Sequence, residues 1–395
     1  MFRDCGRNGS RFGFAMKRVL IITQAFRPSR GGAETYVDDL CEYLRCHGYF
    51  VNVLTYQPIT MKIRGESLER RSNLEVRRFS WIGGNLFHKF EKYPPVVNFL
   101  YVTPMLMLRS LLFMLRYKDE IGVIHAQGLC TAFIAAFLKR IFKKKSVVSI
   151  LAIHNFEKGT FFSNVVAGIF CSLDKVLVEA EVSKREIMAI GVPESKVAIF
   201  MHWVDLDRFK PRDKKVCRAK LGLDVEFLVL FVGRAIPIKG AGTLLEVAKK
   251  VDKRIHFVFV SDAGPQVSLL REAARIERNV IFVGGVDYED LHWYYDAADV
   301  FVMPSQYEED VAKVVLEAIS CGTPVIATNR GAIPSIVDSS VGIVLNPGVA
   351  EIKEAVEYLF YNRAELERLT KNCRPYALKR FSYDNIRVIM DSYDE

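Results

Sequence analysis

The chain has 395 residues, of which 50% are hydrophobic and 26% charged, and its formal net charge is +9. This composition excludes a disordered or fibrous protein, and the length predicts two domains of about 150–200 residues each. The eight cysteines form no CxxC pair and show no metal-ligand spacing, so we expect reduced thiols in a cytoplasmic protein and no metal site. Residues 1–16 are basic and glycine-rich, and we interpret them as a disordered extension or a misassigned start.

The first half reads as an α/β domain. Apolar runs predict buried strands, and an amphipathic pattern after the first of them predicts a helix over 35–49. Continuous apolar strands separated by helices are typical of a parallel sheet that is covered on both faces. The expected strands are 18–26, 50–56, 123–128, 146–154 and 175–181.

Residues 96–115, "VVNFLYVTPMLMLRSLLFML", are about long enough to cross a bilayer. Arg109 and Pro104 would both be costly inside lipid, so we favour a core helix of a globular domain. A helix lying on a membrane surface stays an alternative, because basic residues flank the segment.

A second α/β series follows a charged, proline-bearing break near 203–212. We therefore predict two Rossmann-like domains, with an N-terminal domain over 17–203 and a C-terminal domain over 204–375. The remainder, 376–395, is expected to form a helix that packs back towards the N-terminal domain. The expected strands of the second series are 227–235, 255–264, 280–286, 299–305 and 324–329.

The positive charge is concentrated in the first half: residues 1–200 carry 29 Lys and Arg against 17 Asp and Glu. The basic residues cluster in 61–78 and 138–145. No nucleic-acid-binding motif accompanies them, so we favour an anionic membrane surface as partner over nucleic acid. An ordinary solvated basic face explains the same charge and stays an alternative.

Open α/β sheets bind ligands beyond the carboxyl ends of their strands, so the loops there are the candidate sites. Gly31 and Gly32 open a helix after the first strand, which is a weak signal for an anion at a helix N-terminus. Arg234 and Lys239 flank a proline loop before another helix. Two cations above a helix N-terminus suit a diphosphate.

Two carboxylates stand eight residues apart in "EEDVAKVVLEAISCGTPVIAT", at Glu309 and Glu317. If a helix begins at Glu309, they lie about 80° apart around it and about 12 Å apart along it. If it begins near 310–312, Glu309 lies in the preceding loop. Glu317 has apolar flanks, so a buried carboxylate there needs a hydrogen-bonding partner, and ribose hydroxyls would serve.

The segments "VGRAIPIKG", "NVIFVGGVDYEDLHWYYDAADVFVMPS" and "EEDVAKVVLEAISCGTPVIAT" resemble the retaining glycosyltransferases of family 4, which have the two-domain GT-B fold. In the first half, "GGAETYVDDLCEYLRCHGYFVNVLT" and "VIHAQG" are similar to the same family. The resemblance covers about residues 17–385. It implies two Rossmann-like domains that face a central cleft.

The resemblance also implies roles for individual residues. Arg234 and Lys239 would hold the donor diphosphate, Glu317 would bind the ribose, and Glu309 would contact the donor sugar. His154 would lie beside the transferred sugar, and Gly31 and Gly32 would leave room for phosphates. The backbone at Gly284 and Gly285 would lie beside the base, and Val311 and Ala312 would line the donor site. No metal is implied, and no DxD-like acidic pair stands in a suitable loop.

The sequence also departs from the family pattern. Glu309-Asp310-Val311-Ala312 replaces the usual E-G-F-G, so Ala312 would crowd the donor and Asp310 would add negative charge near its phosphates. Gln127 stands where a second histidine often follows His125.

The sequence therefore predicts a cytoplasmic, metal-independent hexosyltransferase with a UDP- or GDP-sugar donor and no tightly bound cofactor. We expect a lipid-linked or membrane-surface glycan as acceptor, with the enzyme peripheral at the cytoplasmic face. A sugar-nucleotide epimerase of the same fold and a catalytically degenerate nucleotide-sugar-binding subunit are the alternatives.

Overall fold

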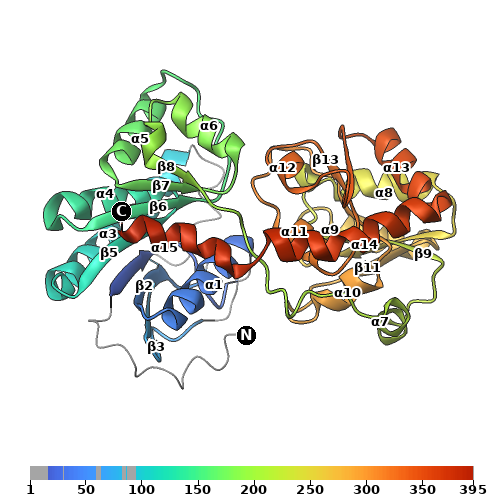
Figure 1. Ribbon diagram of the computed structural model, residues 1–395, viewed down its shortest axis with the longest axis horizontal. Coiled ribbons are helices and arrows are strands. Elements are labelled where there is room, and N and C mark those ends of the chain that lie inside the picture. Colours follow the sequence, from blue (N-terminus) through green and yellow to red (C-terminus); the bar gives the residue numbers. More distant parts are fainter. Residues whose placement is uncertain (1–16, 30, 59–63, 82–85, 87–94, 395) are drawn as a thin grey trace. The chain divides into compact units, whose positions relative to one another are not determined.

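The computed structural model describes residues 17–29, 31–58, 64–81, 86 and 95–394. The chain forms two compact units. Unit 1 comprises Met1–Phe200 together with Ile386–Glu395, and unit 2 comprises Met201–Asn385 (Figure 1). The expectation of two α/β domains with parallel sheets is confirmed.

Unit 1 contains an eight-stranded sheet in the order β3-β4-β2-β1-β5-β6-β7-β8. All neighbours pair in parallel except β3 and β4, which form an antiparallel pair at one edge. The chain runs from β1 outward through β2, then returns to place β5 on the other side of β1. The strands are β1 (Arg18–Ile22), β2 (Phe50–Tyr56), β3 (Leu68–Arg71), β4 (Leu74–Phe79), β5 (Ile121–Gln127), β6 (Lys145–Ile150), β7 (Lys175–Val178) and β8 (Val197–Ile199).

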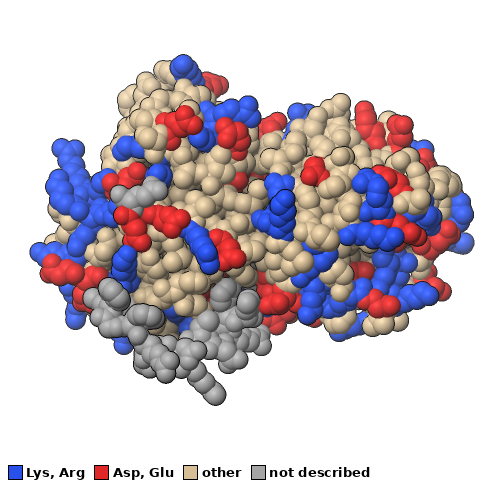
Figure 2. Space-filling view, in the orientation of Figure 1, with Lys and Arg blue, Asp and Glu red and all other residues tan. Residues whose placement is uncertain are grey.

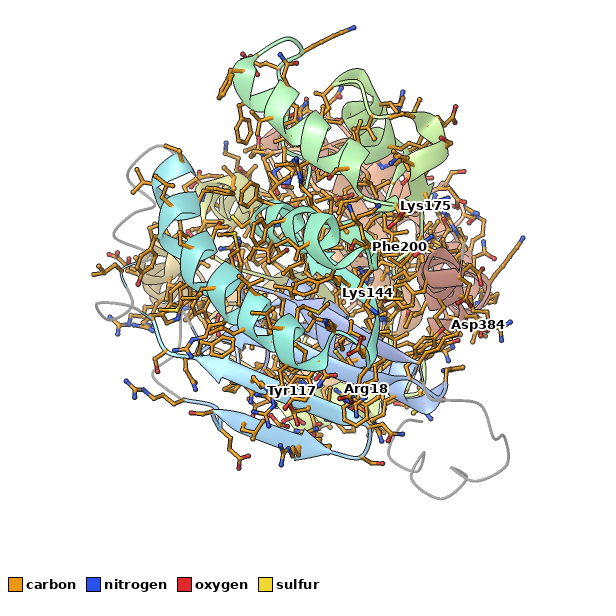
Figure 3. The ribbon with its side chains drawn as sticks, turned by 90° about the vertical axis from the view of Figure 1, so that its left-hand side faces the viewer. Arg18, Tyr117, Lys144, Lys175, Phe200 and Asp384 are labelled. Carbon is orange, nitrogen blue, oxygen red and sulfur yellow. The ribbon has the colours of Figure 1, made fainter. Side chains whose placement is uncertain are left out.

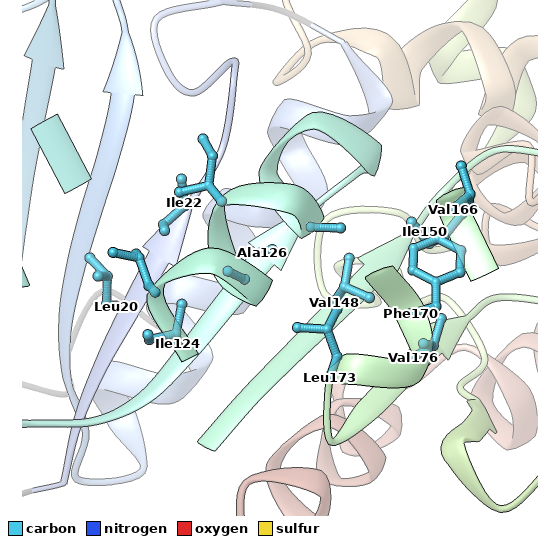
Figure 4. Packing of buried hydrophobic residues seen from close by; sticks show 14 of the residues in the cluster. Leu20, Ile22, Ile124, Ala126, Val148, Ile150, Val166, Phe170, Leu173 and Val176 are labelled. Carbon is cyan, nitrogen blue, oxygen red and sulfur yellow. The ribbon is translucent and has the colours of Figure 1, made fainter. Parts of the chain in front are cut away.

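The helices of unit 1 cover both faces of its sheet, because successive strand side chains point to opposite faces and nearly all those of β1, β2, β5 and β6 are buried. One face packs against α3, α4 and α5, and Figure 4 shows side chains from β1, β5, β6 and α5 in this core. The other face packs against α1 and the C-terminal α15. The helices are α1 (Gly32–Cys46), α3 (Pro95–Tyr117), α4 (Leu129–Phe142), α5 (Phe161–Ser172), α6 (Glu181–Ala189), α15 (Arg387–Asp394) and the 3₁₀ turn η2 (Glu194–Lys196).

Unit 2 contains a six-stranded parallel sheet in the order β11-β10-β9-β12-β13-β14. A hydrophobic core joins one face of this sheet to α8, α9, α13 and the first turns of α14. The strands are β9 (Phe227–Val232), β10 (Ile255–Val260), β11 (Val280–Val283), β12 (Val300–Met303), β13 (Val325–Thr328) and β14 (Gly342–Leu345). The helices are α7 (Lys214–Leu221), α8 (Ala241–Lys250), α9 (Val267–Ile276), α10 (Leu291–Ala297), α11 (Lys313–Ser320), α12 (Ile333–Ile336), α13 (Val349–Tyr361), α14 (Arg363–Arg380), η3 (Pro237–Lys239) and η4 (Tyr383–Ile386).

The boundaries between the units differ from those expected at 203/204 and 375/376. The structure places them at 200/201 and 385/386, because the Asn385 side chain donates to the His202 carbonyl (3.2 Å) and α14 runs without a break to Arg380. Val204 donates its amide to the Phe381 carbonyl (3.0 Å), and the Arg374 guanidinium donates to the carbonyls of Leu206 and Phe209 (2.8 Å each). The segment expected as a linker is therefore anchored to unit 2 by one backbone hydrogen bond and by two from the Arg374 side chain.

The basic segment 61–78 carries less uncompensated charge than its sequence suggests. Its described residues, from 64 onward, include β3 and β4, and their arginines pair with glutamates of the same hairpin. Arg70 and Arg77 contact Glu75, whereas Arg71 and Arg78 contact Glu69. The count of charges in the first half thus overstates the basic surface that this hairpin offers.

The cysteines also differ in part from the expectation of reduced thiols. Cys46 is disulfide-bonded. Among the described residues, the free cysteines are Cys41, Cys130, Cys171, Cys217, Cys321 and Cys373.

Candidate functional site

The candidate site lies where the chain of unit 2 changes direction across its sheet. β9 and β12 are neighbours, but the strands that follow β9 extend to one side and those that follow β12 extend to the other. Such a switch point leaves a crevice beyond the carboxyl ends of the two strands. The loop after β9 carries Arg234 and Lys239, and the loop after β12 carries Glu309.

Lys239 and Glu309 meet at this point although they are 70 residues apart. The Lys239 ammonium group contacts Glu309 Oε1 at 2.6 Å and Oε2 at 2.7 Å. The Ser305 hydroxyl donates to Glu309 Oε1 (2.7 Å). Glu309 is 5% exposed, so its carboxylate is taken out of water and is held by two charge-assisted contacts.

The backbones of three loops approach closely around Glu309. Gly240 has φ +76°, and a Cβ there would lie 1.9 Å from the Pro304 carbonyl oxygen. Gly331, after β13, has φ +57°, and a Cβ there would lie 1.8 Å from the Glu309 carbonyl oxygen. That oxygen accepts the amide of Ala332 (2.7 Å). Glycine is therefore required at both positions by conformation and by space.

The helix after Glu309 begins at Lys313, with Ala312 as its N-cap. Glu309 thus lies in the loop before α11, which is the second of the two geometries that the sequence left open. Ala312 has φ −80° and is buried, so its backbone conformation suits an L-residue. Asp310 is also buried, and Val311 is half-buried.

Glu317 lies inside α11, is 2% exposed, and accepts a hydrogen bond from the Tyr295 hydroxyl at Oε2 (2.9 Å). Burial raises the pKa of Tyr295, and the neighbouring Glu317 carboxylate raises it further. The sequence predicted that a buried Glu317 needs a hydrogen-bonding partner, and Tyr295 provides one within the protein.

Arg234 and Lys239 differ in their surroundings. Arg234 is exposed, and no described residue forms an ion pair or a side-chain hydrogen bond with its guanidinium. Lys239 is compensated by Glu309. The N-terminus of α8 follows directly, and its N-cap residue, Gly240, has no side chain to bind the first amides of the helix. An uncompensated arginine in a loop that leads into uncapped helix amides favours an anion.

Gly284 and Gly285 follow β11, at the same edge of the sheet. A Cβ at Gly284 would meet no atom within 4 Å, whereas one at Gly285 would lie 2.8 Å from Asp262 Cβ. Gly284 thus faces open space, and Gly285 allows close packing against the loop after β10.

The other predicted site residues lie in unit 1. Gly31 is the N-cap of α1, and a Cβ at Gly32 would meet no atom within 4 Å. His154 is exposed in the loop after β6. Its amide donates to Glu186 of α6 at Oε1 (3.0 Å), and its ring lies 5.2 Å from that of Phe156.

Three residues that support the site escaped the sequence analysis. Ser305 and Gly331 position Glu309, and Tyr295 holds Glu317. Ser305 and Gly331 come within three residues after the ends of β12 and β13, which is the position where functional residues of a parallel sheet gather. Tyr295 lies inside an apolar helix and gave no such signal.

Two family models match the chain. "Glycosyltransferase Family 4" matches residues 30–208, and "Glycosyl transferases group 1" matches residues 213–376. The chain belongs to the family 4 glycosyltransferases. The loops that carry Lys239 and Glu309 lie inside the second match, and Gly31, Gly32 and His154 lie inside the first.

Similar curated proteins include D-inositol 3-phosphate glycosyltransferase 2 from Catenulispora acidiphila, 34% identical over 180 residues, or 42% of either chain. D-inositol 3-phosphate glycosyltransferase from Mycobacterium tuberculosis is 31% identical over 196 residues, which cover 47% of this chain and 41% of that protein. The chain thus spans about two fifths of the length of the curated relatives that it matches.

Solved structures match over nearly the full length. A sucrose-phosphate synthase from Thermosynechococcus elongatus has a TM-score of 0.80 at 22% identity, covering 95% of this chain and 97% of the other. HepE from Anabaena, solved in complex with UDP, has a TM-score of 0.76 at 18% identity, covering 96% and 99%. The fold of the chain is therefore that of GT-B glycosyltransferases.

Proposed function

We propose that the protein transfers a hexose-type sugar from a nucleotide-diphosphate sugar to an acceptor, with retained configuration and without an obligatory metal ion. The observation that carries this proposal is the Lys239–Glu309–Ser305 cluster at the β9/β12 switch point. The loop after β9 that carries Lys239 also carries the exposed Arg234 and leads into the uncapped N-terminus of α8.

The chemistry of the reaction requires positive charge where the diphosphate leaves. Arg234 supplies an uncompensated cation, and the first amides of α8 supply hydrogen-bond donors. An ammonium group has three donors, so Lys239 can hold Glu309 and still donate to a phosphate oxygen. These groups would stabilise the leaving diphosphate without a metal ion.

Glu309 is suited to contact the donor sugar because Lys239 and Ser305 fix its carboxylate in one orientation. For Glu317 we propose contact with the ribose, and for the backbone at Gly284 and Gly285 contact with the base. For His154 and for Gly31 and Gly32 of unit 1 we keep the roles predicted from the sequence: contact with the transferred sugar, and room for the phosphates.

UDP is the first donor nucleotide to test and GDP the second, because HepE of the same fold was solved with UDP and with UDP-glucose. For the acceptor we propose a lipid-linked sugar or glycolipid at a cytoplasmic membrane surface. This part of the proposal is supported by the surface of unit 1, where exposed apolar residues of α3 lie beside basic residues.

A second candidate is a nucleotide-sugar-binding subunit without transfer activity. It is favoured by the engagement of Glu309 with Lys239 and Ser305, together with Asp310 at a buried position beside them. Such a protein would bind the donor and leave it unchanged.

Proton NMR of the donor sugar separates these functions. UDP-glucose and GDP-mannose are each incubated with wild type and with Glu309→Gln, with and without a membrane lipid extract. A transferase releases the nucleotide faster when lipid is present, and Glu309→Gln slows this. A new sugar signal with the nucleotide still attached, in the absence of lipid, would show an epimerase instead. Binding without any change in the donor would show the subunit.

A further inference from the structure

One side of α3 is apolar and exposed to solvent. The large aliphatic residues on it repeat at four- and three-residue intervals, so they follow one another along the helix. Pro104 is exposed between them at the same spacing. We call this surface the α3 stripe; its members are Val96, Leu100, Leu108, Leu112 and Leu115, which are 57%, 63%, 50%, 51% and 58% exposed.

The opposite side of α3 belongs to the core of unit 1, where Leu106, Phe113 and Met114 are buried. Among the described residues, α3 is the one helix long and apolar enough to cross a membrane, yet only 28% of its most apolar window is buried. A helix that is fixed to the sheet by one side and apolar on the other suits the surface of a membrane better than its interior.

Three arginines lie beside the α3 stripe around a pocket of about 150 Å³. Arg109 stacks over Phe79 at 5.4 Å from the ring centre, and Arg116 stacks over Tyr117 at 5.5 Å. Arg77 completes the pocket, which Leu112, a member of the stripe, also lines. Apolar and cationic surfaces therefore meet at a single place on α3.

The charges of these arginines differ in availability. Arg77 is paired with Glu75 (2.7 Å) and hydrogen-bonded to the Tyr117 hydroxyl (3.3 Å). No described carboxylate forms an ion pair with Arg109 or Arg116. Aromatic rings hold these two guanidinium groups in place and leave their N–H donors open, which suits a phosphate.

The helix α4, which packs against α3, and the residue that ends it carry further exposed cations, Arg140 and Lys143. Figure 3 views unit 1 from the side on which α3 and α4 lie, and labels Tyr117 at the end of α3. In Figure 2, Lys and Arg side chains gather at the left-hand edge of unit 1, where Figure 1 places α3 and α4.

We propose that the α3 stripe and the pocket of Arg77, Arg109 and Arg116 form a membrane-docking surface, in which the leucines enter the acyl boundary and the arginines bind the phosphate of an anionic lipid. This inference rests on the proposed function in that it gives the membrane acceptor a place on unit 1. An anionic membrane fits the surface because it offers an apolar layer directly below a layer of phosphates.

Co-sedimentation with vesicles tests the proposal on the full-length protein. The vesicles contain phosphatidylcholine alone or with 30% phosphatidylglycerol, a composition chosen to give about the surface charge of an anionic membrane. The variants are Leu108→Gln/Leu112→Gln on the stripe and Arg109→Gln/Arg116→Gln at the pocket. The matched controls lie in unit 2: Leu269→Gln/Ile276→Gln, 44% and 71% exposed, and the exposed pair Arg275→Gln/Arg278→Gln.

Wild type and both control variants should bind the anionic vesicles equally. The arginine variant should bind them about 25-fold more weakly, about fivefold for each charge lost near the surface. The leucine variant should lose about tenfold or more on the same vesicles, because two apolar side chains no longer enter the acyl boundary. Adding inorganic phosphate at 10-fold the lipid phosphate should displace little protein, since a free anion offers nothing to the stripe.

Three results would overturn the proposal: no preference of wild type for anionic vesicles at low salt, equal losses in the unit 2 controls, or full displacement by inorganic phosphate. A thermal-shift measurement with UDP and GDP on the same samples reports on unit 2. If wild type binds a nucleotide but not the anionic vesicles, the docking surface alone is rejected. If wild type binds neither UDP nor GDP, the result counts against the proposed function.

Discussion

The two units place different chemistry at the switch points of similar sheets. In unit 2, the switch between β9 and β12 holds the charged Lys239–Glu309 pair. In unit 1, the switch lies between β1 and β5, and β5 carries His125 at its end in a neutral hydrogen-bonded network. His125 Nε2 lies 2.8 Å from the Ser149 hydroxyl, and Nδ1 lies 2.7 Å from the Tyr393 hydroxyl.

The difference follows from the partners, because the buried Glu309 faces a cation whereas the partners of His125 are hydroxyl groups. His125 is fully buried, and desolvation lowers its pKa to about 3, so the imidazole is neutral at physiological pH. Tyr36 of α1 extends the network to Ser149 (3.0 Å), and Tyr393 ties α15 to it. In unit 1, neutral groups at the switch point therefore hold the C-terminal helix α15. In unit 2, the corresponding end of the sheet carries a charged pair.

The largest effect is expected from removal of the cation in unit 2. Lys239→Met should lower turnover about 100- to 1000-fold, as for loss of a group that stabilises the transition state. It should also destabilise the fold by about 2 kcal/mol or more, because the buried Glu309 carboxylate loses its partner. Steady-state kinetics and urea unfolding measure the two effects.

The double variant Lys239→Met/Glu309→Gln separates stability from catalysis. It should recover most of the lost stability, since no unpaired charge stays buried, but none of the turnover. Recovery of turnover in the double variant would show that the ion pair is structural only.

The neutral network of unit 1 predicts a dependence of stability on pH. The folded-state pKa of His125, about 3, lies below its ordinary value of 6.5, so the unfolded chain takes up a proton first as pH falls. The contribution to stability is therefore complete above pH 6.5 and is lost towards pH 3, by at most about 1.4 kcal/mol per pH unit. Hydrogen exchange of amides in β5 and β6 measures this, and His125→Gln should flatten the profile.

Asp38 of α1 provides a comparison of opposite sign within unit 1. Burial raises its pKa to about 7, with the paired Arg27 opposing the shift. The contribution of Asp38 to the free energy of unfolding is therefore complete below pH 3.8, and it is lost as pH rises towards 7. As pH falls from 6.5 to 3.8, the free energy of unfolding should therefore decrease more steeply in Asp38→Asn than in wild type, and less steeply in His125→Gln. Equal slopes in the two variants would contradict both pKa assignments.

The close approach of loops in unit 2 predicts a graded pair of glycine substitutions. In Gly331→Ala, the alanine would have to adopt a left-handed conformation, and its Cβ would clash with the Glu309 carbonyl oxygen. The substitution should therefore lower the free energy of unfolding by about 2 kcal/mol or more. Gly222→Ala, at a similar φ of +67° but with open space, should cost about 1 kcal/mol. Urea unfolding of both variants tests this, and equal costs would show that the loops adjust freely.

The smallest effect is expected at Tyr295. Tyr295→Phe removes one hydrogen bond from the Glu317 carboxylate and should weaken donor-nucleotide binding about fivefold, for about 1 kcal/mol. Tyr294→Phe removes a hydroxyl from the neighbouring, half-buried tyrosine and should leave binding unchanged. Calorimetric titration of both variants checks the prediction, and equal effects would deny Tyr295 a positioning role.

The strands could be predicted from the sequence because buried parallel strands are continuous apolar runs. Residues 50–56 match β2 at both ends, whereas the run at 227–235 overshoots β9 by three residues, because Gly233 and Ala235 of the loop are not polar. The side of α3 that faces solvent could not be predicted, since apolar residues surround the whole helix.

The site could be predicted in part. Its position after β9 and β12 follows from the rule for parallel sheets, and the sequence indicates both Lys239 and Glu309 as candidates. Their mutual contact could not be predicted, because it depends on how two loops 70 residues apart approach each other through Gly240 and Gly331. Likewise, the contacts of Arg70 with Glu75 and of Arg78 with Glu69 join two strands and depend on the register of a hairpin.

The most direct test of the central claim is calorimetric titration of UDP, GDP and ADP into wild type, Arg234→Gln and Arg275→Gln. Arg234 lies in the loop after β9 at the switch point, and Arg275 is an arginine of α9 that is also exposed. We predict that one nucleotide binds wild type and Arg275→Gln alike, and binds Arg234→Gln about tenfold more weakly, as for loss of one charge-assisted hydrogen bond. Binding that is absent, or equal in all three proteins, would contradict a diphosphate site at this end of the unit 2 sheet.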